Sequence, residues 1–280
     1  MGRARRGSLR LCTIAVCALG FTALAACGKD AGRTTVEPAT TTTTTAATTT
    51  TAATTTTAAA IAAGHPRVEA GVIRRTDGSV TLDVQYPVLT YPGRPDVSDA
   101  VNGALHTGVD RSVAAYAKPA DAPFAGAAVA VGATFQTVLL DDAVASFRIT
   151  WSTYVSGSAH GWSTAVTATF DLRRGTQYAL ADLFQPGTAF LQALSRTCAT
   201  SLEAKIMAAV GDGMPLDPAE LAVIRRGTAP TAANFGAWAI APQGLAVTFQ
   251  ENQVGPYALG TLECDIGRDE LTGLAPDSPL

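Results

Sequence analysis

Histidine and cysteine are scarce in this sequence, and basic residues are fewer than acidic ones. The 280 residues include three histidines and five cysteines. No Cys-x-x-Cys or His-x-x-x-His spacing occurs among them, which argues against a zinc site. Acidic residues outnumber lysine and arginine by 23 to 20. Phosphate binding needs clustered positive charge, so we expect no nucleic-acid partner. We expect no metal and no other cofactor either.

The sequence also lacks an apolar run near its start that could span a bilayer core, which takes about 20 residues. The uncharged stretch 11–26 has sixteen residues and follows four arginines, Arg3, Arg5, Arg6 and Arg10. This pattern indicates a signal peptide at 1–26. The letters LAACG at 24–28 resemble the lipobox of bacterial lipoproteins, which implies that Cys27 carries the lipid. The alternative is an ordinary signal peptide with a chance cysteine.

Residues 27–64 are expected to be the lipid-modified cysteine and a disordered linker. The stretch 40–57 contains only threonine and alanine, so it cannot bury enough apolar area to offset its ordering entropy. Dense extracytoplasmic threonine favours O-glycosylation, with a bare linker as the alternative. Removing the four leader arginines shifts the formal net charge from −3 to −7, which favours a basic partner. We expect a lipid-anchored protein on the extracytoplasmic face of the cell membrane.

The folded body is expected to comprise an N-terminal half at 65–150 and a C-terminal half at 151–275. Strands are predicted where apolar residues alternate, at 80–86, 147–155, 166–172, 245–249 and 259–266. One helix is predicted from a cap at Asp96 or Ser98, and its apolar residues are Val101, Leu105, Val109 and Val113. A second helix is predicted between Pro186 and Gly211. The pattern predicts an α+β fold of largely antiparallel sheets packed by two main helices.

Two cysteines lie in the folded body. Cys198 falls on the apolar stripe of the second predicted helix, and Cys264 falls in a late strand. Disulfides form and persist outside the cytoplasm, so we expect these two residues to pair. Two unpaired core thiols are the alternative.

His160 is the residue on which an enzymatic interpretation depends. Ser158 and Ser163 are close to it in sequence and Asp171 follows, which leaves room for a nucleophile activated by a base. The sequence has no Gly-x-Ser-x-Gly elbow, however, and a hairpin tip excludes water poorly. We therefore expect His160 to be a structural corner between strands that tolerates an unusual φ, and we assign no catalytic residue.

Aromatic residues are the other candidates for a binding surface. Trp151, Trp162 and Trp238 could stack on sugar rings, and the alternative for each is packing in the core. Trp162 lies at the edge of the predicted loop, beside His160. Tyr257 follows Pro256 and is expected to anchor a turn. We name His160, Trp162 and Tyr257 as candidate ligand-binding residues.

Two segments resemble a known family. The letters His160-Gly161, FDL at 170–172 and DLF at 182–184, with GL at 244–245 and PYA at 256–258, are similar to motifs of the RsiV-type ectodomain family. That family includes the extracytoplasmic part of the anti-sigma factor RsiV and secreted mycobacterial immunogenic antigens. Ser158 and Asn252 depart from its pattern at surface turns. A related module precedes the catalytic domain of a peptidoglycan deacetylase, but neither a deacetylase domain nor a sigma-binding segment is recognised in this sequence.

The resemblance implies a recognition module at the cell surface. We expect it to bind an envelope or host ligand without catalysis, either a lysozyme-like basic protein or a peptidoglycan glycan. The alternative function is a hydrolase that acts on cell-wall glycan or its acyl substituents.

Overall fold

A computed structural model describes residues 64–121, 123–210 and 215–280. These residues all belong to one compact unit, Ala53–Leu280. The signal peptide, Cys27, nearly all of the linker and Gly211 lie outside the described residues, so the expectations for them remain predictions. No helix in the described ranges is both long and apolar enough to cross a membrane.

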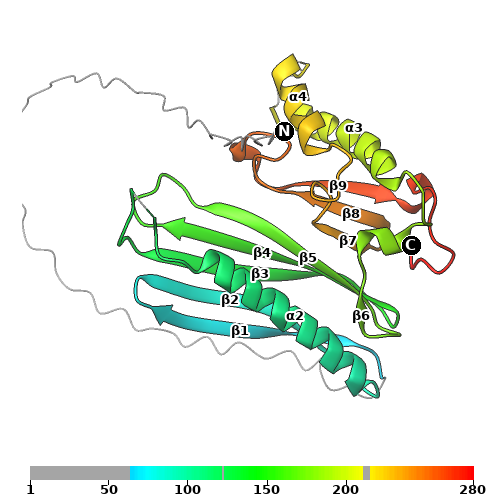
Figure 1. The fold of residues 1–280 in the computed structure, drawn as a ribbon, viewed down its shortest axis with the longest axis horizontal. Coiled ribbons are helices and arrows are strands. Elements are labelled where there is room, and N and C mark those ends of the chain that lie inside the picture. Colours follow the sequence, from blue (N-terminus) through cyan, green and yellow to red (C-terminus); the bar gives the residue numbers. More distant parts are fainter. Residues whose placement is uncertain (1–63, 122, 211–214) are drawn as a thin grey trace, which may run out of the picture. The chain divides into compact units, whose positions relative to one another are not determined.

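The larger sheet has six strands in the order β1-β2-β3-β4-β5-β6 (Figure 1). Its strands are β1 (Arg67–Asp77), β2 (Val80–Thr90), β3 (Val129–Leu140), β4 (Val144–Val155), β5 (Trp162–Asp171) and β6 (Thr176–Gln177). Neighbouring strands are antiparallel except β2 and β3, which are parallel. The helix α2 (Pro95–Tyr116) connects these two, as parallel neighbours require a crossover.

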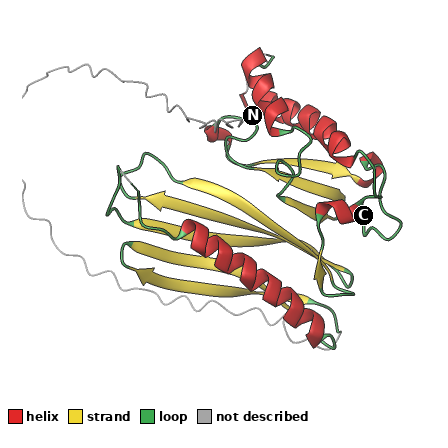
Figure 2. Ribbon diagram, viewed as in Figure 1, coloured by secondary structure: helices red, strands yellow, loops and turns green. Residues whose placement is uncertain are grey.

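α2 covers one face of this sheet (Figure 2). Its residues Val97, Val101, Leu105 and Val109 are buried, as the four-residue apolar spacing predicts. They pack against alternate residues of β2, β3 and β4, including Trp151 and Phe147. The alternation predicted along 147–155 is confirmed, since β4 buries every second residue over that range.

The predicted cap of the first helix is wrong. The helix begins at Pro95 with Arg94 as its N-cap, and no side chain caps it. The Ser98 hydroxyl instead accepts a hydrogen bond from the Tyr91 amide at 2.8 Å, while Asp96 forms an ion pair with Arg94. Proline fits the first helical position because its fixed φ suits the helix and an amide there has no intrahelical partner.

The smaller sheet contains β7 (Trp238–Ala241), β8 (Gly244–Phe249) and β9 (Leu262–Gly267), all antiparallel. The helices α3 (Phe190–Val210) and α4 (Pro218–Gly227) belong to this part of the chain. Leu194, Cys198, Leu202 and Ile206 of α3 are buried in the same core as Val247 and Ile266. The fold is therefore α+β, as predicted, with a third helix, α4, that the sequence interpretation did not include.

One further difference concerns the start of the last strand. This strand begins at Leu262, because Tyr257–Leu259 forms a 3-10 turn and Gly260 follows with φ of +64°. The division of the folded body into halves at 65–150 and 151–275 stays a prediction, and residue 150 lies inside β4.

The two sheets meet through polar contacts. The face of the larger sheet opposite α2 carries Ser146 and Thr167, whose hydroxyls accept hydrogen bonds from the Ile240 and Trp238 amides at 3.2 and 2.8 Å. Arg148 of β4 forms an ion pair with Glu263 of β9, and burial lowers the pKa of Arg148. The two hydroxyls satisfy edge amides of β7 that the smaller sheet leaves unpaired.

Candidate functional site

The turn between β4 and β5, residues 156–161, places His160 beside the C-terminal part of the chain. The imidazole stacks on the Tyr257 ring, with centroids 4.1 Å apart and planes 29° from parallel. The Tyr257 hydroxyl donates to the Gly161 carbonyl at 2.6 Å, and His160 Nδ1 lies 3.0 Å from the same oxygen. The predicted residues His160, Trp162 and Tyr257 therefore lie together, although 96 positions separate Gly161 from Tyr257.

His160 is a structural corner, but the expectation of unusual backbone geometry at this residue is wrong. Gly157 is the turn residue with positive φ, +89°, and Asn252 is the sole non-glycine with positive φ in the described ranges. Glycine takes up the left-handed conformation without a Cβ penalty, so His160 does not need to.

The hydrolase constellation is not assembled at this turn. The Ser158 hydroxyl lies 2.6 Å from the Val155 carbonyl and 3.0 Å from the His160 carbonyl, so its bonds go to the backbone. Asp171 lies at the opposite end of β5, where its carboxylate accepts from the Arg173 amide and pairs with Arg174. An activated nucleophile requires its base within hydrogen-bond reach, and here Ser158, His160 and Asp171 each bond to other groups.

A groove of about 500 Å³ lies beside this corner, on the sheet face opposite α2. It crosses β2, β3, β4 and the start of β5. Tyr257 joins it from the C-terminal turn. Its lining consists of small, polar and aromatic residues, namely Thr81, Asp83, Ala130, Val131, Gly132, Ser152, Thr153, Tyr154, Gly161, Trp162, Ser163 and Tyr257. Strands lie roughly 4.8 Å apart, so four of them extend across about 14 Å.

Two large aromatic side chains near this corner are exposed, and only Tyr154 belongs to the face that carries the groove. Trp162 pairs in register with Thr153, so its side chain lies on the same face as Thr153, the face that α2 covers. Trp162 is 44% exposed and Tyr154 is 46% exposed. Tyr154 alternates with the buried residues Thr153 and Val155, so the pleat directs it to the other face of the sheet. A third exposed ring, Phe124, lies at the turn, within 3.8 Å of where a Cβ on Gly157 would lie. Exposed aromatic rings are available for stacking on a ligand.

Small residues keep the groove open in its middle. Gly132 of β3 lies opposite Ser152 of β4, and a Cβ at Gly132 would come within 3.0 Å of the Ser152 hydroxyl. At the far end, Asp83 pairs with Arg74 of β1 at 3.0 Å. The groove thus runs from an aromatic end to a charged end with hydroxyls between them.

The other two tryptophans, Trp151 and Trp238, do not line the groove. Trp151 is 1% exposed and packs beneath α2, and Trp238 is 7% exposed in the core of the smaller sheet. Burial of both rings excludes the sugar-stacking role that the sequence left open for them. The other histidines are equally remote from the groove: His65 contacts Asp142 at 2.8 Å and His106 contacts the Tyr86 ring.

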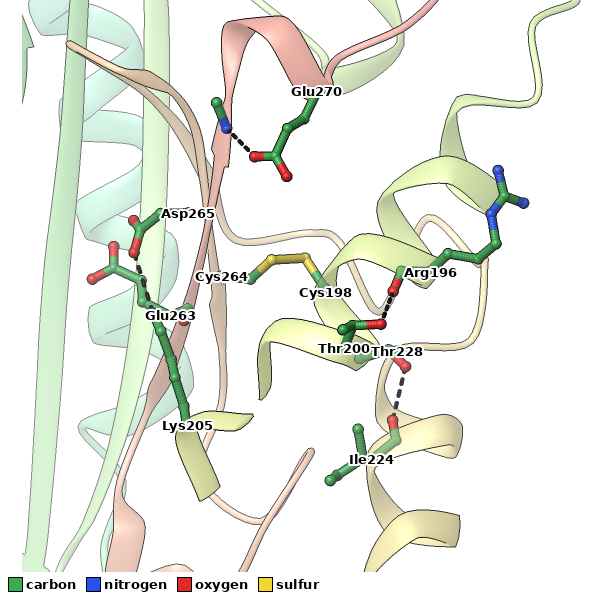
Figure 3. Close-up of a disulfide and its surroundings, with 11 residues drawn as sticks. Arg196, Cys198, Thr200, Lys205, Ile224, Thr228, Glu263, Cys264, Asp265 and Glu270 are labelled. Atoms are coloured by element: carbon green, nitrogen blue, oxygen red, sulfur yellow. Dashed lines mark hydrogen bonds and ion pairs between the residues drawn. A yellow bond between two sulfur atoms is a disulfide. The ribbon is translucent and has the colours of Figure 1, made fainter. Parts of the chain in front are cut away.

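Cys198 and Cys264 form a disulfide that joins α3 to β9, with Cα atoms 5.4 Å apart (Figure 3). Both residues are fully buried. Lys205, about two helical turns further along α3, donates to the Glu263 carbonyl and pairs with Asp265, the residues on either side of Cys264. No cluster of three or more potential metal ligands occurs within the described part of the chain.

Sequence reasoning missed Tyr154, Ser152 and Asp83. Tyr154 had a usable signal, because it is a large aromatic ring at an outward position of a strand with a clear period of two. Ser152 and Asp83 had none. Their proximity depends on the order in which β2, β3 and β4 pair, which the sequence alone does not fix.

Comparison with known proteins identifies one segment. Residues 181–269 match the family model described as "Protein of unknown function (DUF3298)". The chain carries a DUF3298 domain. This segment contains α3, α4 and the smaller sheet, whereas most of the groove lies outside the matched range. No curated protein matches the sequence.

Two solved structures share the fold. A DUF3298 family member from Bacteroides fragilis is 16% identical with a TM-score of 0.53, covering 76% of this chain and 94% of that one. A DUF3298 family protein from Pseudomonas aeruginosa is also 16% identical, with a TM-score of 0.50 and coverage of 75% and 94%. The structural similarity thus extends beyond the matched segment and includes much of the larger sheet.

Proposed function

We propose that this protein is a cell-surface lipoprotein whose folded body binds a cell-wall glycan in the groove, without catalysis. The observation that carries the proposal is the exposed Tyr154 ring, together with Tyr257, in a groove otherwise lined mainly by hydroxyls and small residues. Sugar rings present apolar faces that stack on aromatic side chains and hydroxyl edges that hydrogen-bond to polar groups. The RsiV-type resemblance supports a recognition role at the cell surface.

The glycan test uses residues 53–280 and a soluble N-acetylglucosamine tetramer, measured by titration calorimetry. Saturable binding is expected, and Tyr154→Ala should weaken it roughly tenfold, because a stacked aromatic pair contributes about 0.5–1.5 kcal/mol beyond the area it buries. Val72→Ala is the matched control, since Val72 is exposed but lies on β1, away from the groove.

Two results would overturn the glycan assignment. One is the absence of saturable binding, and the other is equal weakening by Val72→Ala. Saturable binding of lysozyme in place of the tetramer would support the basic-protein alternative, which the formal charge of −7 after leader removal favours.

The anchor is tested separately. Cells that produce the full chain should incorporate labelled palmitate into the protein, and Cys27→Ala should abolish the label. A chain that keeps residues 1–26 or remains unlabelled would contradict the lipoprotein proposal, while leaving the glycan measurement unaffected.

A further inference from the structure

A second hollow, of about 390 Å³, lies between α3, α4 and the loop 252–256. It is separate from the groove and has a different character. Its walls are mainly aliphatic, with Ile206 from α3, Val223 and Ile224 from α4 and Val254 from the loop. Its volume is within the range of small-molecule pockets, roughly 300–1,000 Å³.

α4 presents one face to this hollow. Ala219, Val223 and Arg226 line it at steps of four and three residues, so they lie one above another on the helix. Ala222 and Arg225 do not line it. Rising 1.5 Å per residue, the helix separates Arg226 from Glu220 by about 9 Å along its axis.

The two charged groups at the ends of this face differ in their bonds. Glu220 is engaged, because its carboxylate accepts from the Asp217 amide at 2.8 Å in the N-terminal capping box. Arg226 belongs to none of the ion pairs formed by the described residues. Arg226, an exposed residue of the lining, thus has no ion-pair partner among the described residues and lies at one end of an aliphatic wall.

The wall opposite α4 is fixed in place. The Gln253 side-chain amide donates to the Gly227 and Asn234 carbonyls, both at 3.1 Å. Gly227 packs so closely on the loop that a Cβ there would collide with the Gln253 carbonyl oxygen. These contacts fix the C-terminal end of α4 against the loop that forms the opposite wall.

From these features we propose that this hollow binds a medium-chain fatty carboxylate. The aliphatic walls take the acyl chain out of water, and the Arg226 guanidinium pairs with the carboxylate, a charge-assisted contact of high geometric specificity. This binding site is independent of the proposed glycan groove.

The test is calorimetric titration of residues 53–280 with decanoate below its micellar concentration. One saturable site is expected, and each shortening by two methylenes should weaken binding roughly tenfold, since a buried methylene contributes about 0.8 kcal/mol. Decyltrimethylammonium, which has the same tail and the opposite charge, should bind at least tenfold more weakly.

Two pairs of variants locate the site. Arg226→Ala should weaken decanoate binding at least tenfold, and Arg225→Ala, the neighbouring arginine outside the lining, should leave it unchanged. Ala219→Leu should fill the hollow and abolish binding, while Ala222→Leu, at a position outside the lining, should not. Leucine suits an exposed helical position, so both leucine variants are expected to fold. Equal binding of both surfactants, or equal effects within either variant pair, would overturn the proposal.

Discussion

Gly161 has no room for a side chain, and this position tests the corner described above. A Cβ there would lie 2.7 Å from the Thr153 carbonyl oxygen, which belongs to the backbone of the neighbouring strand. Gly161→Ala should therefore lower the free energy of unfolding by about 1–3 kcal/mol, the usual cost of overpacking. Urea denaturation followed by circular dichroism provides the measurement.

Gly108→Ala is the control for that substitution. Gly108 lies inside α2, where an added Cβ meets nothing within 4 Å, so alanine should stabilise the protein by about 0.5–1 kcal/mol. If both alanine variants shift stability in the same direction, the close contact at Gly161 does not determine the corner.

The chemistry of single residues was only partly predictable. The expectation of a structural His160 agrees with its contacts, but those contacts involve Tyr257, which the sequence places almost a hundred positions away. No local sequence pattern predicts contact between such distant residues. The buried positions of Trp151 and Trp238 show the same limit, since ring type does not reveal which side of a strand faces the core.

α4 depends on a capping box at its first turn. The Asp217 carboxylate accepts from the Ala219 and Glu220 amides at 2.7 and 2.8 Å. Asp217→Ala should cost about 1 kcal/mol in unfolding free energy, because two helix amides lose their acceptor. Thermal or urea unfolding measures the loss. Asp110 is an exposed acidic residue in the middle of α2, so Asp110→Ala should change the free energy of unfolding by less than about 0.5 kcal/mol. A comparable loss in this variant would argue against capping as the cause.

At the scale of elements, the periodicity of apolar residues predicted the long helices and strands correctly, whereas the boundaries of elements were predicted less well. β4 and α3 were predictable because each repeats one period over many residues and packs one face. α4 is only ten residues long, but the sequence Asp217-Pro218-Ala219-Glu220 at its start is a capping signature that could have revealed it. The parallel pairing of β2 with β3 follows from the crossover through α2 and not from either strand alone.

The disulfide links two elements that are 66 positions apart. Closing a loop of that length restricts the unfolded chain, which in the chain-entropy model stabilises the fold by about 4 kcal/mol. Unfolded residues 53–280 should contain no titratable thiol before reduction, and reductant should lower the urea midpoint. In a Cys198→Ala, Cys264→Ala double variant, reductant should have no effect. Two free thiols in the unreduced protein would refute the pairing.

At the scale of the whole molecule, the groove was beyond sequence reasoning for a topological reason. Its residues come from four strands and a C-terminal turn, and only the pairing order β2-β3-β4-β5 brings them to one surface. Alternation along each strand predicts which residues share a face, but not which strands are neighbours. The fold class could be predicted because it needs only the types of element and their order.

The Gln250 side chain covers part of the outer edge of β5. Its side-chain amide accepts from the Ala165 N–H at 2.8 Å and donates to the Ala165 carbonyl at 2.9 Å, as a neighbouring strand would. Further along, the two-residue strand β6 pairs with Phe170 and Asp171. Exposed strand edges act as templates for chain-to-chain aggregation. One glutamine and one very short strand thus shield this border of the largest sheet against fibril-like growth.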